Sequence, residues 1–531
     1  MMCRGLKTVG IRMLAMVALS SGVTAGLAGD GLGSNPGGLP RIDPDYTGIL
    51  IPPNIAPLNF SVREPGVRFG LKIQAPQGPS IEIESRSPAI EIPPAKWRAL
   101  LEANRGQAMT WVVHTVDAAG AQQVFTPVTN TIARENIDSH LVYRLLNPQY
   151  SIYGAGTMGI YQRNLENYTQ STVLKIKEVN WHSGTCLNCH NFALNKPNPM
   201  ALHIRSDKQG MPMLIARGDE VTTVNRPFGY LSWHPSGKLL AFSINKLSLF
   251  FHSIGETRDV FDAASDLGIY RVDENTYEKP APISEKDLLE TWPGWSPDGR
   301  YLYYCCAPVR PMEEFREIKY DLRRIAYDPD KNTWGAPEVI VSARDSGLSA
   351  GQPKVSPDGR FLIFCLCNYG NFPVYQPSSD LYIMDLATMK HRRMECNSAA
   401  TDSWHSWSGN SRWLVFSSKR RDGYVSRPHF TYVDPEGRSS KAFILPQENP
   451  AFYDSFVKTF NVPELIDGPV QVGWRDLYQA VFHPKHRITP SSNTPGSPTG
   501  QPPGELEDAR ETRSASTPKL IPYSQPARND H

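Results

Sequence analysis

The sequence predicts an all-β protein, and two patterns along its 531 residues predict it. In residues 42–138, short segments such as "RFGLKIQAP" alternate apolar and polar side chains, which is typical of strands with one buried face. Farther along, several segments repeat one turn-and-strand motif. Glycine (40 residues) and proline (46 residues) are abundant, which favours turns between strands over long helices.

The first 28 residues are typical of an export signal. Basic residues between Arg4 and Arg12 precede a short apolar run, Met13 to Leu19, and small residues near Ala28 suit cleavage. This run is too short to span a bilayer, and no later segment reaches a spanning length. We therefore expect a periplasmic or otherwise exported protein with no transmembrane segment after signal removal.

A small domain is expected to follow the signal. Residues 29–41 are rich in glycine and predict a flexible leader. The alternating segments of residues 42–138 predict a β-sandwich-like domain. One helix is expected at "PPAKWRALLEANRG", because Pro93 and Pro94 suit a first helical turn and Gly106 suits a helix end.

The repeated motif aligns without gaps in four places, at steps of 62, 60 and 52 residues: "WHPSGKLLAFS" from Trp233, "WSPDGRYLYYC" from Trp295, "VSPDGRFLIFC" from Val355 and "WSGNSRWLVFS" from Trp407. The "PDG" turn fixes φ at proline and takes φ > 0 at glycine. The run after the turn is short and apolar, as a fully buried strand is. One column holds leucine in all four copies: Leu240, Leu302, Leu362 and Leu414. Repeats of this length predict a β-propeller, here of five or six blades.

The propeller is expected to fill most of the remaining chain. Residues 139–224 are assigned to a divergent first blade, residues 225–465 to regular blades, and residues 466–484 to a closing segment. Residues 485–531 are rich in Pro, Ser and Thr without periodic apolar positions, so a disordered tail is expected there.

The "WSPDGR" and "DLYIMDL" segments resemble the WD-type repeats of TolB-like propeller proteins, over residues 225–445. This resemblance implies the fold and no particular activity, because propellers host many functions. The net charge of +2 predicts no basic face, so nucleic acid is not an expected partner.

One short motif carries specific chemistry. The segment "TCLNCH" holds Cys186, Cys189 and His190 in the order Cys-x-x-Cys-His. This is the attachment pattern of haem c, in which two thiols add to the haem vinyl groups and the adjacent histidine is the proximal iron ligand. We therefore expect one covalent haem c, bound by Cys186 and Cys189 and ligated by His190.

Two other interpretations of the motif remain open. A disulfide or redox pair suits an exported protein, and a metal site uses the same donors. Zinc, however, needs a fourth ligand, and no strand–helix unit of the thioredoxin kind surrounds the motif. The cysteines of the repeats have a simpler explanation, because Cys305 and Cys365 occupy a packing column where the other copies have Ser243 and Ser417.

The segments around the motif predict its place in the fold. "GIYQRNLENYTQSTVLKI" before it is expected to form inner strands of the first blade, and "MALHIRSDKQGMPMLIARGD" after it an outer hairpin. The motif would then be an insertion displayed at one face of the propeller. The whole order, over residues 42–460, resembles a group of exported TolB-like proteins described as cytochrome c-like. That resemblance implies haem and export, not a reaction.

The second axial ligand of the iron is expected to come from the neighbourhood of the motif, where the candidates are His182, Met200, His203, Met211 and Met213. Strand alternation in "MALHIR" puts Met200 on a wholly apolar face, which is typical of core. His203 lies on the other face with Arg205. We therefore predict His203 as the distal ligand, with Met200 as the runner-up.

Three functions are consistent with these features. The leading hypothesis is electron transfer with a redox partner protein, without catalysis by the chain itself. The second is a propeller that binds a protein or glycan and uses haem as a structural or sensory group. The third is a haem peroxidase-like enzyme, for which His234, His405 and Asp402 are the candidate acid–base groups.

Overall fold

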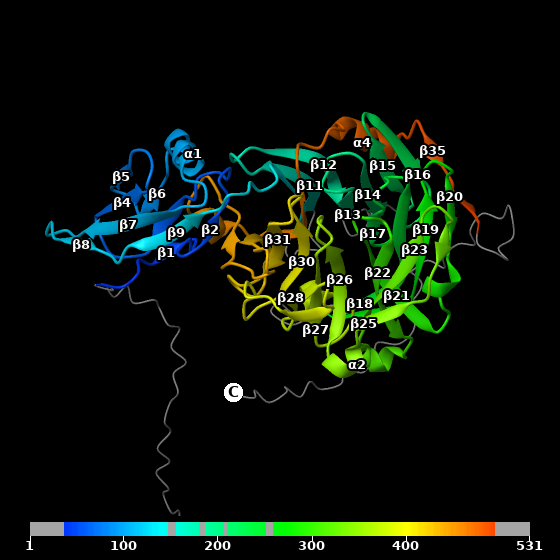
Figure 1. Cartoon of the computed structure of the whole chain (residues 1–531). Coiled ribbons are helices and arrows are strands. Elements are labelled where there is room, and N and C mark those ends of the chain that lie inside the picture. The colour runs from blue at the N-terminus through cyan, green and yellow to red at the C-terminus, as the bar shows by residue number, and fades with distance from the viewer. Residues whose placement is uncertain (1–36, 147–155, 180–185, 206–209, 251–258, 494–531) are drawn as a thin grey trace, which may run out of the picture.

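The computed structural model describes residues 37–146, 156–179, 186–205, 210–250 and 259–493. Two domains lie side by side: a small N-terminal domain, blue to cyan in Figure 1, and a large ring of sheets. Nearly all regular structure is β, as expected. The predicted signal peptide lies outside the described residues. None of the described helices is long and apolar enough to cross a membrane.

The N-terminal domain has two sheets and one helix, which confirms the expected sandwich-like architecture. The smaller sheet has three strands: β1 (Ile42–Asp43), β3 (Phe60–Val62) and β6 (Ala89–Ile90). The larger sheet has six: β2 (Leu50–Ile51), β9 (Val128–Ile132), β7 (Ala108–Val116), β4 (Arg68–Gln74), β5 (Ile81–Ser85) and β8 (Gln122–Val124).

The predicted helix is α1 (Pro94–Ala103), which begins at the expected proline. It buries Trp97, whose ring meets that of Trp111 edge-on at 6.1 Å between centroids. Gly106 follows the helix with φ 75°, a left-handed conformation that glycine adopts without strain.

The last five residues of the predicted flexible leader are ordered. Residues 37–41 belong to the domain, because Thr126 donates from its backbone N–H to Gly38 and from its hydroxyl to Gly37. Arg41 also binds Glu64 at 2.9 Å. The low complexity of this segment concealed these contacts with residues far along the chain. The rest of the leader lies outside the described residues.

The second domain is a six-bladed β-propeller. Each blade is one antiparallel sheet, and the innermost strands follow one another around a central channel. Blades 1 to 3, each written from its innermost strand outward, are β34 (Thr459–Ile466), β10 (His140–Leu146), β11 (Gly156–Asn164), β12 (Gln170–Val179); β13 (Cys186–Phe192), β14 (Met200–Arg205), β15 (Met213–Arg217), β16 (Glu220–Val224); and β17 (Leu231–Trp233), β18 (Leu239–Phe250), β19 (Asp259–Arg271), β20 (Thr276–Glu278).

Blades 4 to 6 complete the ring, in the same outward order: β21 (Leu288–Trp295), β22 (Tyr301–Pro308), β23 (Asp321–Asp328), with β24 (Thr333–Trp334) and β25 (Glu338–Val341) both on β23; β26 (Ser349–Val355), β27 (Phe361–Cys367), β28 (Asp380–Asp385), β29 (Lys390–Arg393); and β30 (Asp402–Trp407), β31 (Trp413–Ser418), β32 (Arg427–Tyr432), β33 (Phe443–Ile444). Short helical turns lie between strands: η2 (Ala281–Ile283), η3 (Met312–Glu317), α2 (Ala343–Ser346), η4 (Pro373–Tyr375) and α3 (Phe452–Ser455).

The repeated motif forms the end of an innermost strand, a tight turn and the start of the second strand. Its first residue pairs across the hairpin with the leucine of the aligned column in all four copies: Trp233↔Leu240, Trp295↔Leu302, Val355↔Leu362 and Trp407↔Leu414. These leucines have no exposed surface. The turn takes φ between 61° and 72° at one shared position: Gly237, Gly299, Gly359 and Ser411. The alignment is therefore confirmed in three dimensions.

The predicted divergent first blade was wrong, because residues 139–224 divide between two blades. β10, β11 and β12 belong to blade 1, whose innermost strand is β34 from the far end of the chain. The haem motif opens β13, the innermost strand of blade 2, and is therefore not an inserted loop. Sequence order hid this, because the pairing of β10 with β34 joins Leu141 to Leu465.

Two C-terminal expectations also change. The predicted closing segment, residues 466–484, contains α4 (Trp474–Phe482), which packs Leu477 and Val481 against blades 1 and 2. The first part of the predicted disordered tail is ordered, because β35 (Arg487–Ile488) and β36 (Ser491–Ser492) add parallel strands to β16 and β20. Exposed strand edges supply backbone hydrogen bonds whatever the side chains are. Residues 494–531 lie outside the described part of the chain.

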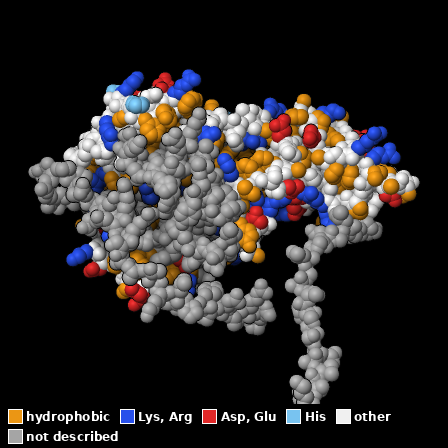
Figure 2. Space-filling model, turned by 180° about the vertical axis from the view of Figure 1, so that it is seen from behind, with side chains coloured by type: hydrophobic (Ala, Val, Ile, Leu, Met, Phe, Trp, Pro, Cys, Tyr) orange, Lys and Arg blue, Asp and Glu red, His pale blue; other side chains and the backbone are white. Residues whose placement is uncertain are grey.

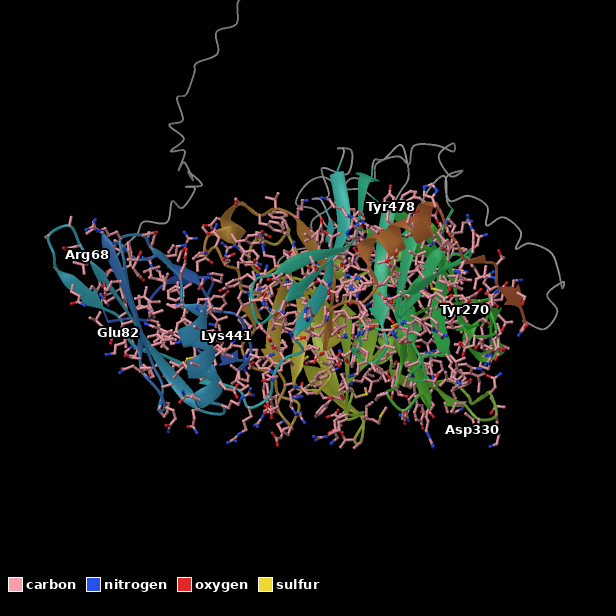
Figure 3. The ribbon with its side chains drawn as sticks, turned by 90° about the horizontal axis from the view of Figure 1, so that it is seen from above. Arg68, Glu82, Tyr270, Asp330, Lys441 and Tyr478 are labelled. Carbon is pink, nitrogen blue, oxygen red and sulfur yellow. The ribbon has the colours of Figure 1, made fainter. Side chains whose placement is uncertain are left out.

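The two domains share one apolar core, in which Trp111 and Trp413 belong to the same cluster. Trp413 also donates from its indole N–H to the backbone oxygen of Glu135 at 2.9 Å. Lys441 lies at the junction in Figure 3 and binds Asp45 at 2.7 Å. On the face of the N-terminal domain seen in Figure 2, acidic and basic side chains are interspersed, in line with the low net charge.

Leu362→Asp is expected to unfold the propeller, because it places a charge without a partner in a fully buried position between Val355 and Met384. The free energy of unfolding should fall by more than about 3 kcal/mol. Lys390→Asp, on the exposed outer strand of the same blade, is the control. Thermal unfolding followed by circular dichroism measures both, and a Leu362→Asp protein that melts like the parent would contradict the blade assignment.

Candidate functional site

The Cys-x-x-Cys-His motif, formed by Cys186, Cys189 and His190, lies on β13. This strand is irregular at Cys189. Leu187 pairs with Ile204 and His190 pairs with Leu202, so Asn188 and Cys189 form a β-bulge. A bulge bends its strand and re-aims a side chain. Cys189 is half-buried at this bulge. Of Cys186 the structure describes the backbone, which pairs with Arg205.

Every innermost strand contributes a residue at this level of the channel. In five blades this residue lies three positions before the last residue of the innermost strand (Cys189, Tyr230, Trp292, Gln352 and Trp404), and in blade 1 it is Val462, four positions before the end of β34. In four blades the residue takes a left-handed φ, between 45° and 57°: Trp292, Gln352, Trp404 and Val462. Such a conformation costs about 1–3 kcal/mol in a residue other than glycine and marks positions held by their surroundings.

This ring of channel residues was missed from the sequence alone. The signal was present, because Tyr230, Trp292, Gln352 and Trp404 fall in one column when the repeat alignment is extended upstream by three residues. The column varies in chemistry, so it lacks the repetition that marked the leucines.

Aromatic rings fill one side of the channel. Tyr230 stacks on Trp292 with 3.5 Å between ring centroids, and Trp292 meets Trp404 edge-on at 5.1 Å. Cys189 lies near Tyr230, since its thiol is among the groups that raise the pKa of that phenol, after burial. The remaining space in the channel is about 60 Å³.

His190 is the most unusual residue of the site. Its side chain is fully buried, and neither ring nitrogen has a hydrogen-bond partner of good geometry, although the backbone of Val142 lies close enough to raise the pKa of the imidazole slightly. The nearest carboxylate oxygen, Glu464 Oε2 on β34, is 3.9 Å from Nε2, which is too far for a hydrogen bond. Burial, together with the nearby Arg144, lowers the pKa of His190 to about 3, so the imidazole is neutral.

The donor chemistry at β13 fits a covalent haem c. A neutral imidazole is the form that ligates a metal. Buried polar atoms nearly always have a hydrogen-bond partner, so two ring nitrogens without one are unusual. Leaving such a group without a partner costs about 1–3 kcal/mol, which a bond to iron would offset. The side chain of His190 is fully buried, and its nearest carboxylate is Glu464 of blade 1.

The predicted distal ligands lie on β14. Met200 is buried in the core with Leu202 and Ile204, as the alternation predicted. His203 is also buried, contrary to the expectation that it faces an exposed haem, and its Nε2 accepts the backbone N–H of Phe228 at 2.9 Å. His190 shares the face of Leu202, whereas His203 lies on the opposite face.

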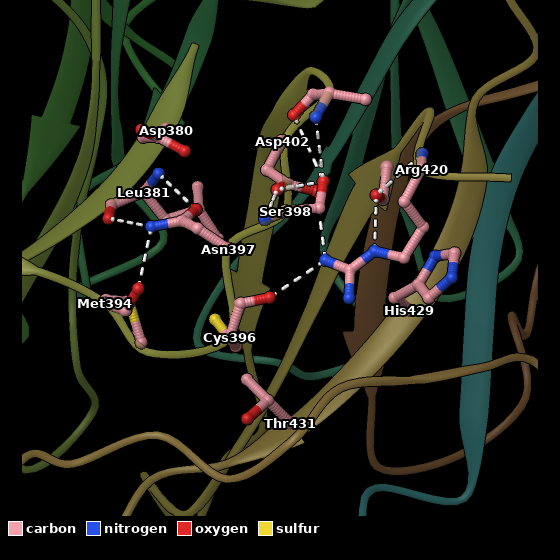
Figure 4. A network of polar contacts seen from close by, with 12 residues as sticks. Asp380, Leu381, Met394, Cys396, Asn397, Ser398, Asp402, Arg420, His429 and Thr431 are labelled. Atoms are coloured by element: carbon pink, nitrogen blue, oxygen red, sulfur yellow. Dashed lines mark hydrogen bonds and ion pairs between the residues drawn. The ribbon is translucent and has the colours of Figure 1, made fainter. Parts of the chain in front are cut away.

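The three candidate groups for a peroxidase already have structural roles. His234 Nδ1 contacts Ser236 Oγ at 2.8 Å within its turn. Asp402 pairs with Arg420 at 3.1 Å and accepts the backbone N–H of Ser398, within the polar network of Figure 4. His405 lines the channel, and its Nε2 contacts the backbone oxygen of Ile363 at 3.1 Å.

The cysteines of the repeats are buried, as expected for packing residues, and none forms a disulfide: Cys305, Cys306, Cys365, Cys367 and Cys396. Burial raises the pKa of each thiol, so they are protonated and unreactive. Within the described residues, no three His, Cys, Asp or Glu side chains gather in a group that could hold a metal ion.

Comparison with protein-family models and with curated proteins found no match. Solved structures of other proteins show weak likenesses over part of the chain. An oligogalacturonate lyase from Vibrio parahaemolyticus is 11% identical, with 56% of this chain and 92% of that chain covered and a TM-score of 0.30. A Kuenenia stuttgartiensis hydrazine synthase is 10% identical, with 59% and 47% covered and a TM-score of 0.37. The propeller of Dos1 is 10% identical, with 50% and 62% covered and a TM-score of 0.31. These scores are too low to say anything about the site.

Glu464→Gln is expected to change how stability depends on pH. Burial raises the pKa of Glu464 to about 7 from 4.5, so the folded protein holds this proton more tightly than the unfolded chain. The parent therefore loses stability as pH rises through that interval, by at most about 3 kcal/mol, and glutamine removes this loss.

Urea unfolding at about pH 5 and about pH 8 measures the difference. The stability of Glu464→Gln relative to the parent should rise with pH. The exposed substitution Glu317→Gln controls for the change of net charge. A difference between Glu464→Gln and the parent that stays constant with pH would contradict the burial of this carboxyl group.

Proposed function

We propose that the chain is an exported β-propeller that binds one haem c through Cys186 and Cys189, with His190 as the proximal iron ligand. The bound iron would supply one-electron redox chemistry, and the protein would exchange electrons with a partner protein. The observation that carries the proposal is His190, a neutral, buried imidazole with two unpartnered nitrogens next to the cysteine pair. Such a donor set suits iron ligation.

The N-terminal sequence supports the same proposal. Haem c is attached on the outer side of the bacterial inner membrane, and residues 1–28 are typical of an export signal. The two features depend on different parts of the sequence, so their agreement is informative.

Electron transfer is favoured over the two alternatives. A peroxidase needs an acid–base group on the open side of the iron, and the three candidates are engaged in turns, ion pairs or backbone contacts. A binding propeller with a structural or sensory haem is the second candidate, because the channel is lined by aromatic and polar side chains. The redox partner would recognise the haem edge.

The protein, expressed together with haem-attachment machinery, is expected to carry one covalent haem. Its intact mass should exceed that of the mature chain by one haem, and the denatured protein should give a pyridine haemochrome spectrum with both vinyl groups saturated. Cys186→Ala together with Cys189→Ala should abolish attachment, whereas Cys305→Ala should not. A parent mass equal to the bare mature chain would contradict the proposal.

The distal ligand is predicted to be His203, which requires it to give up its hydrogen bond from Phe228. The oxidised protein should then be low-spin with two imidazole ligands, and His203→Ala should become high-spin or bind added imidazole. His391→Ala, on an exposed strand, is the matched control. A near-infrared band of a methionine–iron bond that disappears in Met200→Leu would instead establish the runner-up.

A further inference from the structure

We propose that the central channel of the propeller binds a small monoanion with two acceptor oxygens, of the carboxylate type, through Gln352, Trp404 and Lys354. These residues come from the innermost strands of blades 5 and 6 and line the same space as His190. The site goes beyond the proposed function and does not require haem.

The amide of Gln352 has one defined orientation. Its Oε1 accepts the backbone N–H of Trp404 at 2.8 Å and the thiol of Cys365 at 3.4 Å. Rotating the amide by 180° would break both contacts, so this orientation is fixed. In it, Nε2 has no acceptor for its hydrogens. Nε2 is a buried donor without a partner, in a residue that is 5% exposed. A donor in this state calls for an acceptor.

Trp404 supplies a second donor of the same kind. Its indole Nε1 is buried and has no hydrogen-bond partner. An indole nitrogen only donates, so the missing partner must be an acceptor. Two other tryptophans of the channel region differ, because Trp292 donates to Asn371 O at 2.8 Å and Trp407 to Lys354 O at 3.2 Å. Edge-on packing against Trp292 holds the Trp404 ring.

Charge at the site favours an anion. Lys354 lines the channel and forms no ion pair in the described part of the chain, but its positive charge acts on Glu464 and offsets part of the rise in pKa that burial causes there. Among the lining residues the one acidic side chain is Glu464, whose Oε1 accepts the backbone N–H of Phe192 at 3.2 Å and contacts Asn191 Nδ2 at 3.5 Å. A lysine beside two unpartnered N–H donors suits an acceptor that carries negative charge.

The size of the channel limits the ligand. The space is about 60 Å³, and a water-sized group needs roughly 10–15 Å³. The channel therefore has room for about four to six such groups, which is enough for formate or acetate. A porphyrin or a sugar ring is too large, so this ligand is distinct from the proposed haem.

Isothermal titration calorimetry with sodium formate and sodium acetate, at ionic strength held constant with sodium chloride, tests the proposal on the intact protein. We expect one saturable site per chain. Trp404→Phe keeps the ring and removes the N–H, and Lys354→Met removes the charge; each should weaken binding at least about tenfold. Trp474→Phe, at an exposed tryptophan of α4, and Lys390→Met are the matched controls and should bind like the parent.

Three results would overturn the proposal. One is the absence of saturable heat with either anion. Another is equal binding of neutral acetamide, which would remove the requirement for charge. The third is a shift of the haem absorption bands on binding that Trp404→Phe leaves intact, because the anion would then sit on the iron. If a variant fails to fold, comparing the binding of acetate and acetamide to the parent protein still tests whether the site requires a negative charge.

Discussion

The fold depends on one strand pairing, that of β34 with β10. It joins Leu141 to Leu465 and Leu145 to Phe460, so the last blade strand of the chain becomes the innermost strand of the first blade. A ring closed in this way leaves no blade with an open inner edge. The entropy of closing so long a loop grows only slowly with its length, so the paired, buried strand can offset it.

The same pairing builds the candidate site. β34 brings Val462 and Glu464 into the channel, beside His190 on β13. It also encloses His190 between blades 1 and 2, where burial keeps the imidazole neutral and without hydrogen bonds. The Cys-x-x-Cys-His motif therefore lies on one of the innermost strands of the propeller.

The sequence predicted the parts of this fold that rest on local patterns. The turn-and-strand motif located the hairpins in four blades, and Pro93, Pro94 and Gly106 located α1. The sequence did not predict blade 1, because β10 pairs with β34, which lies more than 300 residues later in the chain and is not indicated by any local pattern. His203 was placed on the correct strand face, but its contact with Phe228 depends on the neighbouring blade. The sequence did not indicate Gln352 and Trp404 as site residues, because their distinguishing feature is a buried N–H group without a hydrogen-bond acceptor, which only the structure shows.

The central claim is that the haem motif is the innermost strand of a blade, and hydrogen–deuterium exchange tests it most directly. The double variant Cys186→Ala, Cys189→Ala cannot attach haem and keeps the backbone of β13. Peptides covering residues 186–192 should exchange as slowly as those of β14, because the two strands are hydrogen-bonded along a buried sheet. Exchange as fast as in the exposed turn at residues 329–332 would contradict the account, since it would place the motif on a loop outside the ring.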